Sequence, residues 1–157
     1  APLLGQRLID ARIPIMLERL HRLPDLDEDN IDLPFCLPAT LSKMGVQFCL
    51  QNEGGMEAMN ARNIPFLAGT AQAYGLSEKE ALKSITLSPC EIMGISDKYG
   101  SLKIGKSATL FISKGPALDM RTNQVTHVLI HGKIKNCQNF QEGLFLKYQK
   151  KYAEISD

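Results

Sequence analysis

The pattern of apolar and polar residues predicts short strands and helices that alternate in the early part of the chain. Two compact apolar runs, Ile13–Leu17 and Val46–Leu50, have the length and composition of buried strands. A helix is predicted between them over Leu37–Met44, since Pro38 suits a first helical turn and Gly45 stands just past the end. The order strand, helix, strand is that of a βαβ unit, which favours parallel strands joined by a right-handed crossover.

The segments on either side of the first apolar run differ in character. Residues 2–11 predict a short helix, because Leu4, Leu8 and Ala11 recur at helical spacing. Residues 18–35 predict a long loop, because prolines and carboxylates interrupt any apolar period. Its carboxylates lack the glycine and the distal glutamate of a calcium-binding EF-hand loop, so we interpret them as a solvated surface: Asp25, Asp27, Glu28, Asp29 and Asp32.

Helices are predicted again after the second apolar run, beyond a polar, glycine-rich turn at Gln51–Gly55. The first covers residues 64–74, with Pro65 near its start and Gly75 at its end. Two more follow: one starts at a capping box from Ser77 to Glu80 with Leu82 and Ile85 on its buried face, and one runs from Ser88 to Gly94.

The pattern changes to that of strands beyond Gly94. Residues 107–113 and 125–130 are rich in β-branched and apolar residues and predict two strands, and Gly132-Lys133 predicts a tight turn into a third at Ile134. The tail from Phe140 to Tyr152 predicts a terminal helix, because apolar residues fall four apart there. The predicted fold class is therefore α/β over the first part of the chain and all-β over the strands that follow it.

The bulk properties narrow the class of protein. The chain has 157 residues and a net charge of +1, so neither a nucleic acid nor an anionic membrane is an expected partner. It contains no apolar run of about 18 residues, so no transmembrane helix is expected. The four cysteines form no CxxC pair, which favours free thiols in a reducing compartment such as the cytoplasm and leaves disulfides open: Cys36, Cys49, Cys90 and Cys137.

Two parallel strands do not make a stable sheet with both faces covered, so further strands are needed. A closed eight-stranded barrel takes roughly 200 residues or more. We expect the other strands to come from residues before Ala1 or from another copy of the chain. The start at Ala1 rather than Met leaves natural processing, proteolysis and truncation open.

Several segments, taken in chain order, carry a resemblance to a known family: Leu23–Pro34, Asn63–Ala71, Ala73–Ser77, Glu80–Leu82, Ile85–Pro89, Met93–Ile95, Gly100–Leu110 and Val128–Lys133. The first resembles the loop after barrel strand seven of the amidohydrolase superfamily, near its imidazolonepropionase-like members, and the others resemble the last barrel helices and the following β-region of that superfamily.

The resemblance implies a (β/α)8 metal-dependent-hydrolase barrel with a small composite β-domain. In that arrangement residues 13–17 correspond to strand seven and residues 46–50 to strand eight. The chain then divides into the C-terminal part of a barrel over 1–94, strands of the composite β-domain over 95–137 and a helical tail over 138–157.

The same resemblance implies zinc or iron in a full-length protein, held mainly by histidines on the first six strands. This chain contains only His21, His127 and His131 and no HxH pair, so we expect no metal ligand and no cofactor within it. His127 and His131 are expected on one strand, about 13 Å apart, which is too far to share an ion. An isolated chain of this kind is expected to be inactive.

Three residues are candidates for the site. Alignment from Val46 places Glu53 where the family has the aspartate that takes a proton from water, with Asn52 before it, and the loop after strand seven carries His21. Glu53 is thus a candidate catalytic base, while Asn52 and His21 are candidate substrate contacts. Glutamate adds a methylene to the family's aspartate, so its oxygens are displaced.

Two functional hypotheses follow. The first is the C-terminal portion of a hydrolase that cleaves non-peptide C–N bonds in a cyclic amide or similar small substrate. The second is a metal-free, amidohydrolase-like binding or assembly protein, which the glutamate at position 53 favours. An HxH pair encoded upstream of Ala1 would support the first hypothesis.

Overall fold

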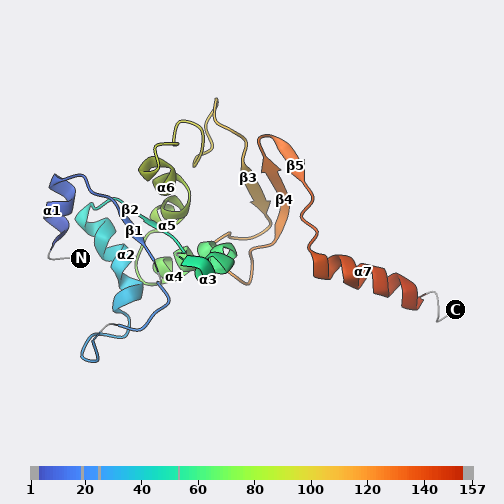
Figure 1. Ribbon diagram of the computed structural model, residues 1–157, viewed down its shortest axis with the longest axis horizontal. Coiled ribbons are helices and arrows are strands. Elements are labelled where there is room, and N and C mark those ends of the chain that lie inside the picture. The colour runs from blue at the N-terminus through green and yellow to red at the C-terminus, as the bar shows by residue number, and fades with distance from the viewer. Residues whose placement is uncertain (1–3, 19, 25, 53, 154–157) are drawn as a thin grey trace.

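The computed structural model describes residues 4–18, 20–24, 26–52 and 54–153. Helices gather around a two-stranded sheet at one end of the molecule, a three-stranded sheet follows, and the last helix stands beyond that sheet (Figure 1). The hydrophobic core lies at the first end, where α2, α4 and α5 pack against the two-stranded sheet.

The two-stranded sheet joins β1 (Ile15–Leu17) and β2 (Phe48–Leu50) in parallel, which confirms the predicted pairing. Ile15 faces Phe48 and Leu17 faces Leu50 in the register. Because side chains alternate along a strand, these four lie on one face, and all four belong to the hydrophobic core or pack against it. The same register puts Met16 beside Cys49 on the other face.

The helices before the three-stranded sheet include α1 (Gly5–Asp10), α2 (Leu33–Met44), α4 (Ile64–Ala73), α5 (Glu78–Ile85) and α6 (Leu87–Ile92). They confirm the predicted helices, with boundaries that differ at α2. The capping role of Ser77 is also confirmed, because its hydroxyl accepts the Glu80 amide at 3.2 Å. The residues that form the core are Leu20, Ala39, Leu41, Val46, Phe48, Leu50, Leu67, Ala68, Ala71, Leu76, Ala81 and Leu118.

Helix α2 begins at Leu33, so the predicted start at Leu37 was wrong and the acidic loop ends earlier than expected. Pro34 takes the first-turn position, and Pro38 lies inside the helix with its side chain fully buried. An interior proline removes one helical hydrogen bond. Here burial of Pro38 and of its helical neighbours Ala39 and Leu41 outweighs that loss.

The connection after β2 is helical where a simple turn was predicted. It contains α3 (Gly54–Glu57) and the 3-10 helix η2 (Ala58–Asn63) before α4 begins.

The buried face of α5 also differs from the prediction, since Leu82 is 46% exposed while Ala81 and Ser84 are buried. Ser84 is satisfied there, because its hydroxyl donates to the Ala81 carbonyl at 2.7 Å.

A separate antiparallel sheet contains β3 (Leu110–Ser113), β4 (Val125–Ile130) and β5 (Lys133–Lys135) in that order. The turn from β4 to β5 is made by His131 and Gly132, whose φ angles are +50° and +75°. Positive φ at both positions is typical of a type I′ hairpin. His131 therefore lies in the turn and not on the strand that carries His127, which corrects that prediction.

The chain ends in α7 (Phe140–Ala153), the predicted terminal helix, and none of its residues is buried. Among the described helices, none combines the length and the apolar character that crossing a membrane would require.

The four cysteines are free, as predicted. Cys49 is fully buried, and burial raises the pKa of its thiol above the ordinary value. The thiol therefore stays protonated at neutral pH, where it packs as a small apolar group.

Candidate functional site

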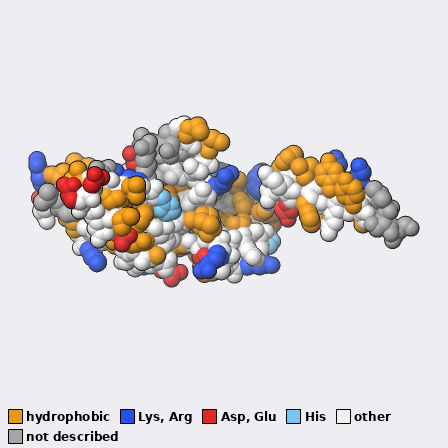
Figure 2. Space-filling model, turned by 90° about the horizontal axis from the view of Figure 1, so that it is seen from below, with side chains coloured by type: hydrophobic (Ala, Val, Ile, Leu, Met, Phe, Trp, Pro, Cys, Tyr) orange, Lys and Arg blue, Asp and Glu red, His pale blue; other side chains and the backbone are white. Residues whose placement is uncertain are grey.

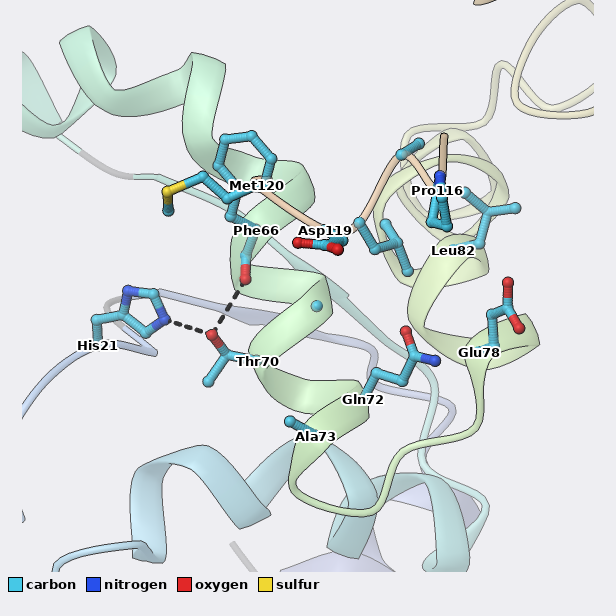
Figure 3. Close-up of a pocket in the computed structure, with 13 residues that line it drawn as sticks. His21, Phe66, Thr70, Gln72, Ala73, Glu78, Leu82, Pro116, Asp119 and Met120 are labelled. Atoms are coloured by element: carbon cyan, nitrogen blue, oxygen red, sulfur yellow. Dashed lines mark hydrogen bonds between the residues drawn. The ribbon is translucent and has the colours of Figure 1, made fainter. Parts of the chain in front are cut away.

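A hollow of about 600 Å³ opens between α4, α5 and the segment Pro116–Met120 (Figure 3). Its walls are largely apolar, with five polar side chains placed around them. The polar residues are His21, Thr70, Gln72, Glu78 and Asp119, and the apolar ones include Phe66, Ala73, Leu82, Leu118 and Met120.

His21 is held at the edge of the hollow by the hydroxyl of Thr70. The His21 Nε2 lies 2.7 Å from Thr70 Oγ1, and that hydroxyl donates to the Phe66 carbonyl at 3.1 Å (Figure 3). A hydroxyl has one proton to donate, so the hydrogen between His21 and Thr70 belongs to Nε2. The Nδ1 of a neutral His21 ring is then the nitrogen that can accept a hydrogen bond.

Aromatic residues also pack beside the His21 imidazole. The ring of Phe35 meets His21 edge to face at 6.2 Å and lies 5.0 Å from the ring of Tyr74. The negative charge of Asp32, together with burial and a hydrogen bond from the phenol, raises the pKa of Tyr74. Tyr74 therefore remains a neutral phenol at physiological pH, and its ring helps to orient Phe35 against His21.

The segment Pro116–Met120 forms the opposite wall and approaches α4 at Gly69. A β-carbon on Gly69 would collide with the backbone carbonyl of Leu118, so only glycine admits this approach. Leu118 is 9% exposed and belongs to the core. The Asn123 amide also holds the segment, by donating to the Ala117 carbonyl at 3.0 Å.

Gly69→Ala is expected to push the segment away from α4 and lower stability by about 1–3 kcal/mol, the usual cost of overpacking a tight contact. Thermal unfolding should fall by several degrees. Gly143→Ala in α7 is the matched control, because nothing lies within 4 Å of its β-carbon position. The control should raise helix content and leave the unfolding temperature unchanged or higher. Equal effects of both substitutions would contradict the close approach at Gly69.

Asp119 closes the turn that ends this segment. Its carboxylate accepts the Arg121 amide at 2.9 Å and the Thr122 hydroxyl at 3.0 Å. These two bonds, with a smaller contribution from the Arg121 charge, lower its pKa from the ordinary value of 3.8. The carboxylate is therefore ionised at neutral pH.

The lowered pKa of Asp119 predicts a pH effect of definite sign. A depressed folded-state pKa contributes stability that is present above the ordinary value of 3.8 and is lost as pH falls through the folded value. Asp119→Asn removes the titrating group, so the stability of the variant should fall less as the pH is lowered through this range. The check is urea unfolding of both forms from neutral pH down to below pH 3.8. Parallel curves for the two forms would show that Asp119 does not contribute.

The other two predicted site residues lie elsewhere. Asn52 follows β2, is half-buried and donates through its side chain to the Asn60 carbonyl at 2.8 Å, so it fixes the start of the connection to η2. It does not line the hollow around His21. Glu53 lies outside the residues that the structure describes. Thus the structure does not bring His21 and Asn52 together in one hollow: His21 contacts Thr70, and Asn52 contacts Asn60.

Sequence reasoning missed most of the residues that surround His21. Thr70, Gln72, Glu78 and Asp119 come from α4, α5 and the connection between β3 and β4. The available signal was the pair Gly69-Thr70 within a helix, because a helical glycine often marks a close backbone contact. The partner of that contact, at Leu118, could not be read from the sequence pattern.

The sequence model of the amidohydrolase family matches residues 37–135. The chain belongs to the amidohydrolase family. It is 27% identical over 111 residues to an imidazolonepropionase of Flavobacterium psychrophilum, covering 66% of this chain and 27% of that protein. It is also similar to the crystal structure of an amidohydrolase from Thermotoga maritima, with a TM-score of 0.73 and 29% identity over 88% of this chain.

A prolidase solved with N-methylphosphonate-L-proline shares the fold at a TM-score of 0.52 and 22% identity, over 69% of this chain and 28% of that one. The amidohydrolase chain described here spans 27% of the imidazolonepropionase and 35% of the Thermotoga maritima chain. Its mixed α/β architecture therefore corresponds to part of a larger amidohydrolase structure.

The described part of this amidohydrolase does not fit the zinc or iron that the sequence resemblance implies. No group of three or more histidine, cysteine, aspartate or glutamate side chains is placed to hold an ion within those residues. His127 lies 3.0 Å from the Thr126 hydroxyl, and His131 lies 3.1 Å from the Ser107 hydroxyl, so each has a hydroxyl neighbour.

Proposed function

We propose that this chain forms the last two strand–helix units of an amidohydrolase barrel and part of the β-domain that follows. In this proposal β1 is strand seven and β2 is strand eight of a metal-dependent hydrolase of non-peptide C–N bonds. The chain alone is inactive, because the residues that would hold the metal come from the rest of the barrel.

The observation that carries the proposal is a parallel strand pair with open edges in a member of the amidohydrolase family. Among the described residues, β1 and β2 form a sheet of two strands. Unpaired strand edges present free amide and carbonyl groups to any strand that can add to them. A pair of parallel strands is too small to be stable as a sheet, so both edges favour neighbours.

Exposed apolar residues support the same assignment. Beside the open edge, Ile13 is 53% and Met16 is 47% exposed. A hollow of about 450 Å³ runs along β1 and is bordered by Met16, Leu17 and Leu37. Inward-facing residues of a closed barrel interdigitate to fill its interior. Preceding barrel strands, or the strands of another copy of this chain, would cover these positions.

The proposed substrate is a cyclic amide or a similar small molecule, which the likeness to an imidazolonepropionase supports. Glu53 is the proposed base, while His21 and Asn52 are the proposed substrate contacts. His21 can offer Nδ1 because Thr70 occupies Nε2, and Asn52 can offer its side-chain oxygen because its nitrogen is bound to Asn60.

A second candidate is an amidohydrolase-like protein that binds or assembles without metal. Glutamate at position 53, where the sequence resemblance implies aspartate, favours it. A carboxylate displaced by one methylene can still form contacts, while an error of about 1 Å at a reacting centre costs roughly a hundredfold in rate.

The test begins with the protein encoded by the region upstream of Ala1 together with this chain. It would be loaded with zinc or iron and assayed against cyclic amides, beside the isolated chain. Turnover by the larger protein alone supports the hydrolase. Turnover by the isolated chain overturns the proposal, and a folded larger protein without metal or turnover supports the second candidate.

The barrel assignment has a separate test. Met16→Glu puts a charge on the face proposed to be covered and should destabilise the larger protein, while the isolated chain should tolerate it. Met93→Glu is the matched control, since Met93 is 66% exposed near the end of α6. Equal tolerance of both substitutions in the larger protein would contradict the placement of β1.

A further inference from the structure

The hollow between α4, α5 and the segment Pro116–Met120 brings together hydrogen-bond acceptors from separate elements. Gln72 comes from α4, Glu78 from the first turn of α5 and Asp119 from the segment (Figure 3). His21 stands at the edge of the same hollow. Two of these four side chains are carboxylates, which accept hydrogen bonds and carry negative charge. The polar groups of the hollow therefore favour a ligand that donates hydrogen bonds and carries positive charge.

Three of these side chains have acceptor atoms that the described part of the chain does not use. Thr70 occupies the Nε2 of His21, so the Nδ1 of the neutral ring is left to accept. Within the residues that the structure describes, the side chains of Gln72 and Glu78 take part in no hydrogen bond or ion pair. A ligand can therefore bind these groups without breaking a contact inside the described residues.

Asp119 supplies a negative charge that is already held in place. Its two bonds, from the Arg121 amide and the Thr122 hydroxyl, fix the carboxylate and keep its pKa low, so it is ionised at neutral pH. The Arg121 guanidinium lies 4.0 Å away, but its side chain is 92% exposed, so the pair is solvated and weak. A carboxylate that is fixed in advance loses little conformational freedom when it binds a cation.

The walls of the hollow also offer apolar surface. Phe66, Leu82 and Met120 line it, and Leu82 is 46% and Met120 69% exposed. Figure 2 shows hydrophobic side chains exposed over the helical end of the molecule, with acidic side chains among them. The volume of about 600 Å³ lies within the range of about 300–1,000 Å³ that is typical of small-molecule sites. The ligand therefore needs an apolar body as well as a positive charge.

We propose that this hollow binds a small organic amine, an ammonium group on an apolar body. The ammonium group interacts with the carboxylates of Asp119 and Glu78, and the apolar body packs on Phe66, Leu82 and Met120. Among the described residues that line the hollow, none is a lysine or an arginine, so a cation meets no like charge on these walls and an anion meets no opposite charge. The inference does not depend on the proposed hydrolase function, because it needs only this chain and is tested without turnover.

Titration of the chain with benzylamine, followed through its backbone amide signals in NMR spectra, tests the proposal. We expect saturable shifts confined to α4, the first turn of α5 and residues 116–120. Benzyl alcohol has the same ring without the charge, and benzoate has the opposite charge. Both should bind at least about tenfold more weakly, because hydrogen bonds to charged groups are the stronger ones. No saturable shift at these amides, or equal binding of the three compounds, overturns the proposal.

Glu78→Gln tests the charge. It keeps the shape of the side chain and removes the charge, so the dissociation constant for benzylamine should rise by about threefold to tenfold. Glu142→Gln is the matched control, because it makes the same change at an exposed residue of α7 that does not line the hollow. The amide spectrum of each variant shows whether its fold is intact. Unchanged affinity in a folded Glu78→Gln variant contradicts the assignment.

Leu82→Lys tests the place of binding. Leu82 is 46% exposed on the wall formed by α5, so the helix should accept a lysine there, and its ammonium group would compete for the same carboxylates. Benzylamine should then bind at least about tenfold more weakly. Leu102→Lys adds the same charge at a residue that is 84% exposed and does not line the hollow, so it should leave the affinity unchanged. Equal affinities of the two lysine variants would show that the amine binds elsewhere and overturn the proposal.

Discussion

If the larger protein is the proposed hydrolase, Glu53→Gln in it is expected to lower turnover by about a hundredfold to ten-thousandfold, the usual contribution of a general base. The proposed role is to take a proton from the attacking water and pass it to the leaving nitrogen. An amide keeps the shape of the side chain but cannot accept that proton. Metal content should stay constant, because the proposed metal ligands lie elsewhere in the barrel.

Glu53→Asp is the matched control for that experiment. It restores the residue that the sequence resemblance implies at this position and should retain or raise activity. The comparison requires single-turnover rates and metal analysis on all three forms. Normal turnover by Glu53→Gln would show that Glu53 is only a loop residue, and the non-catalytic interpretation of this position would stand.

The parts of the fold that sequence predicted are those determined by local chemistry. The apolar runs at 13–17 and 46–50 gave both short strands, and the helix between them required parallel pairing. The Ser77 cap and the start of α4 were also predictable, because a hydroxyl before a helix and a proline in its first turn act within a few residues.

The parts that sequence missed depend on distant contacts. The sequence pattern predicted Pro38 in the first turn of a helix, but burial against the core keeps it in the interior of α2. The sequence pattern predicted His131 on a strand, but the hairpin to β5 places it in the turn, where its φ angle is positive. The hollow around His21 arises where Leu118 reaches across to Gly69. The end of α4 and all of α5, α6 and β3 separate these two residues in the chain.

The candidate site was predicted only in part for the same reason. His21 was found because its loop follows a strand, and the structure gives it a partner, Thr70, that lies 49 residues away. Asn52 was found by its place after β2, and its side chain turned out to be used locally by Asn60. Family resemblance placed Glu53, and no pattern within the chain could have done so.

Gly100→Ala is expected to be strongly destabilising, because it combines a left-handed backbone with a close packing contact. Gly100 has a φ of +86°, and an added β-carbon would lie 2.9 Å from each of three α6-region atoms, the Thr86 carbonyl oxygen, the Leu87 Cα and the Cys90 sulfur. The left-handed backbone costs an alanine about 1–2 kcal/mol. Overpacking against backbone atoms adds roughly 1–3 kcal/mol, because a rotamer change cannot relieve it. Together these should lower the unfolding temperature by about 5–15 °C.

Gly132→Ala separates the two causes. Gly132 has a similar φ of +75°, but nothing lies within 4 Å of its β-carbon position. It should therefore lose only the backbone contribution of about 1–2 kcal/mol. Urea unfolding of both variants measures the difference, which we assign to the packing of Gly100 against the start of α6. If the two variants lose the same stability, that contact contributes nothing and only the backbone angle requires glycine.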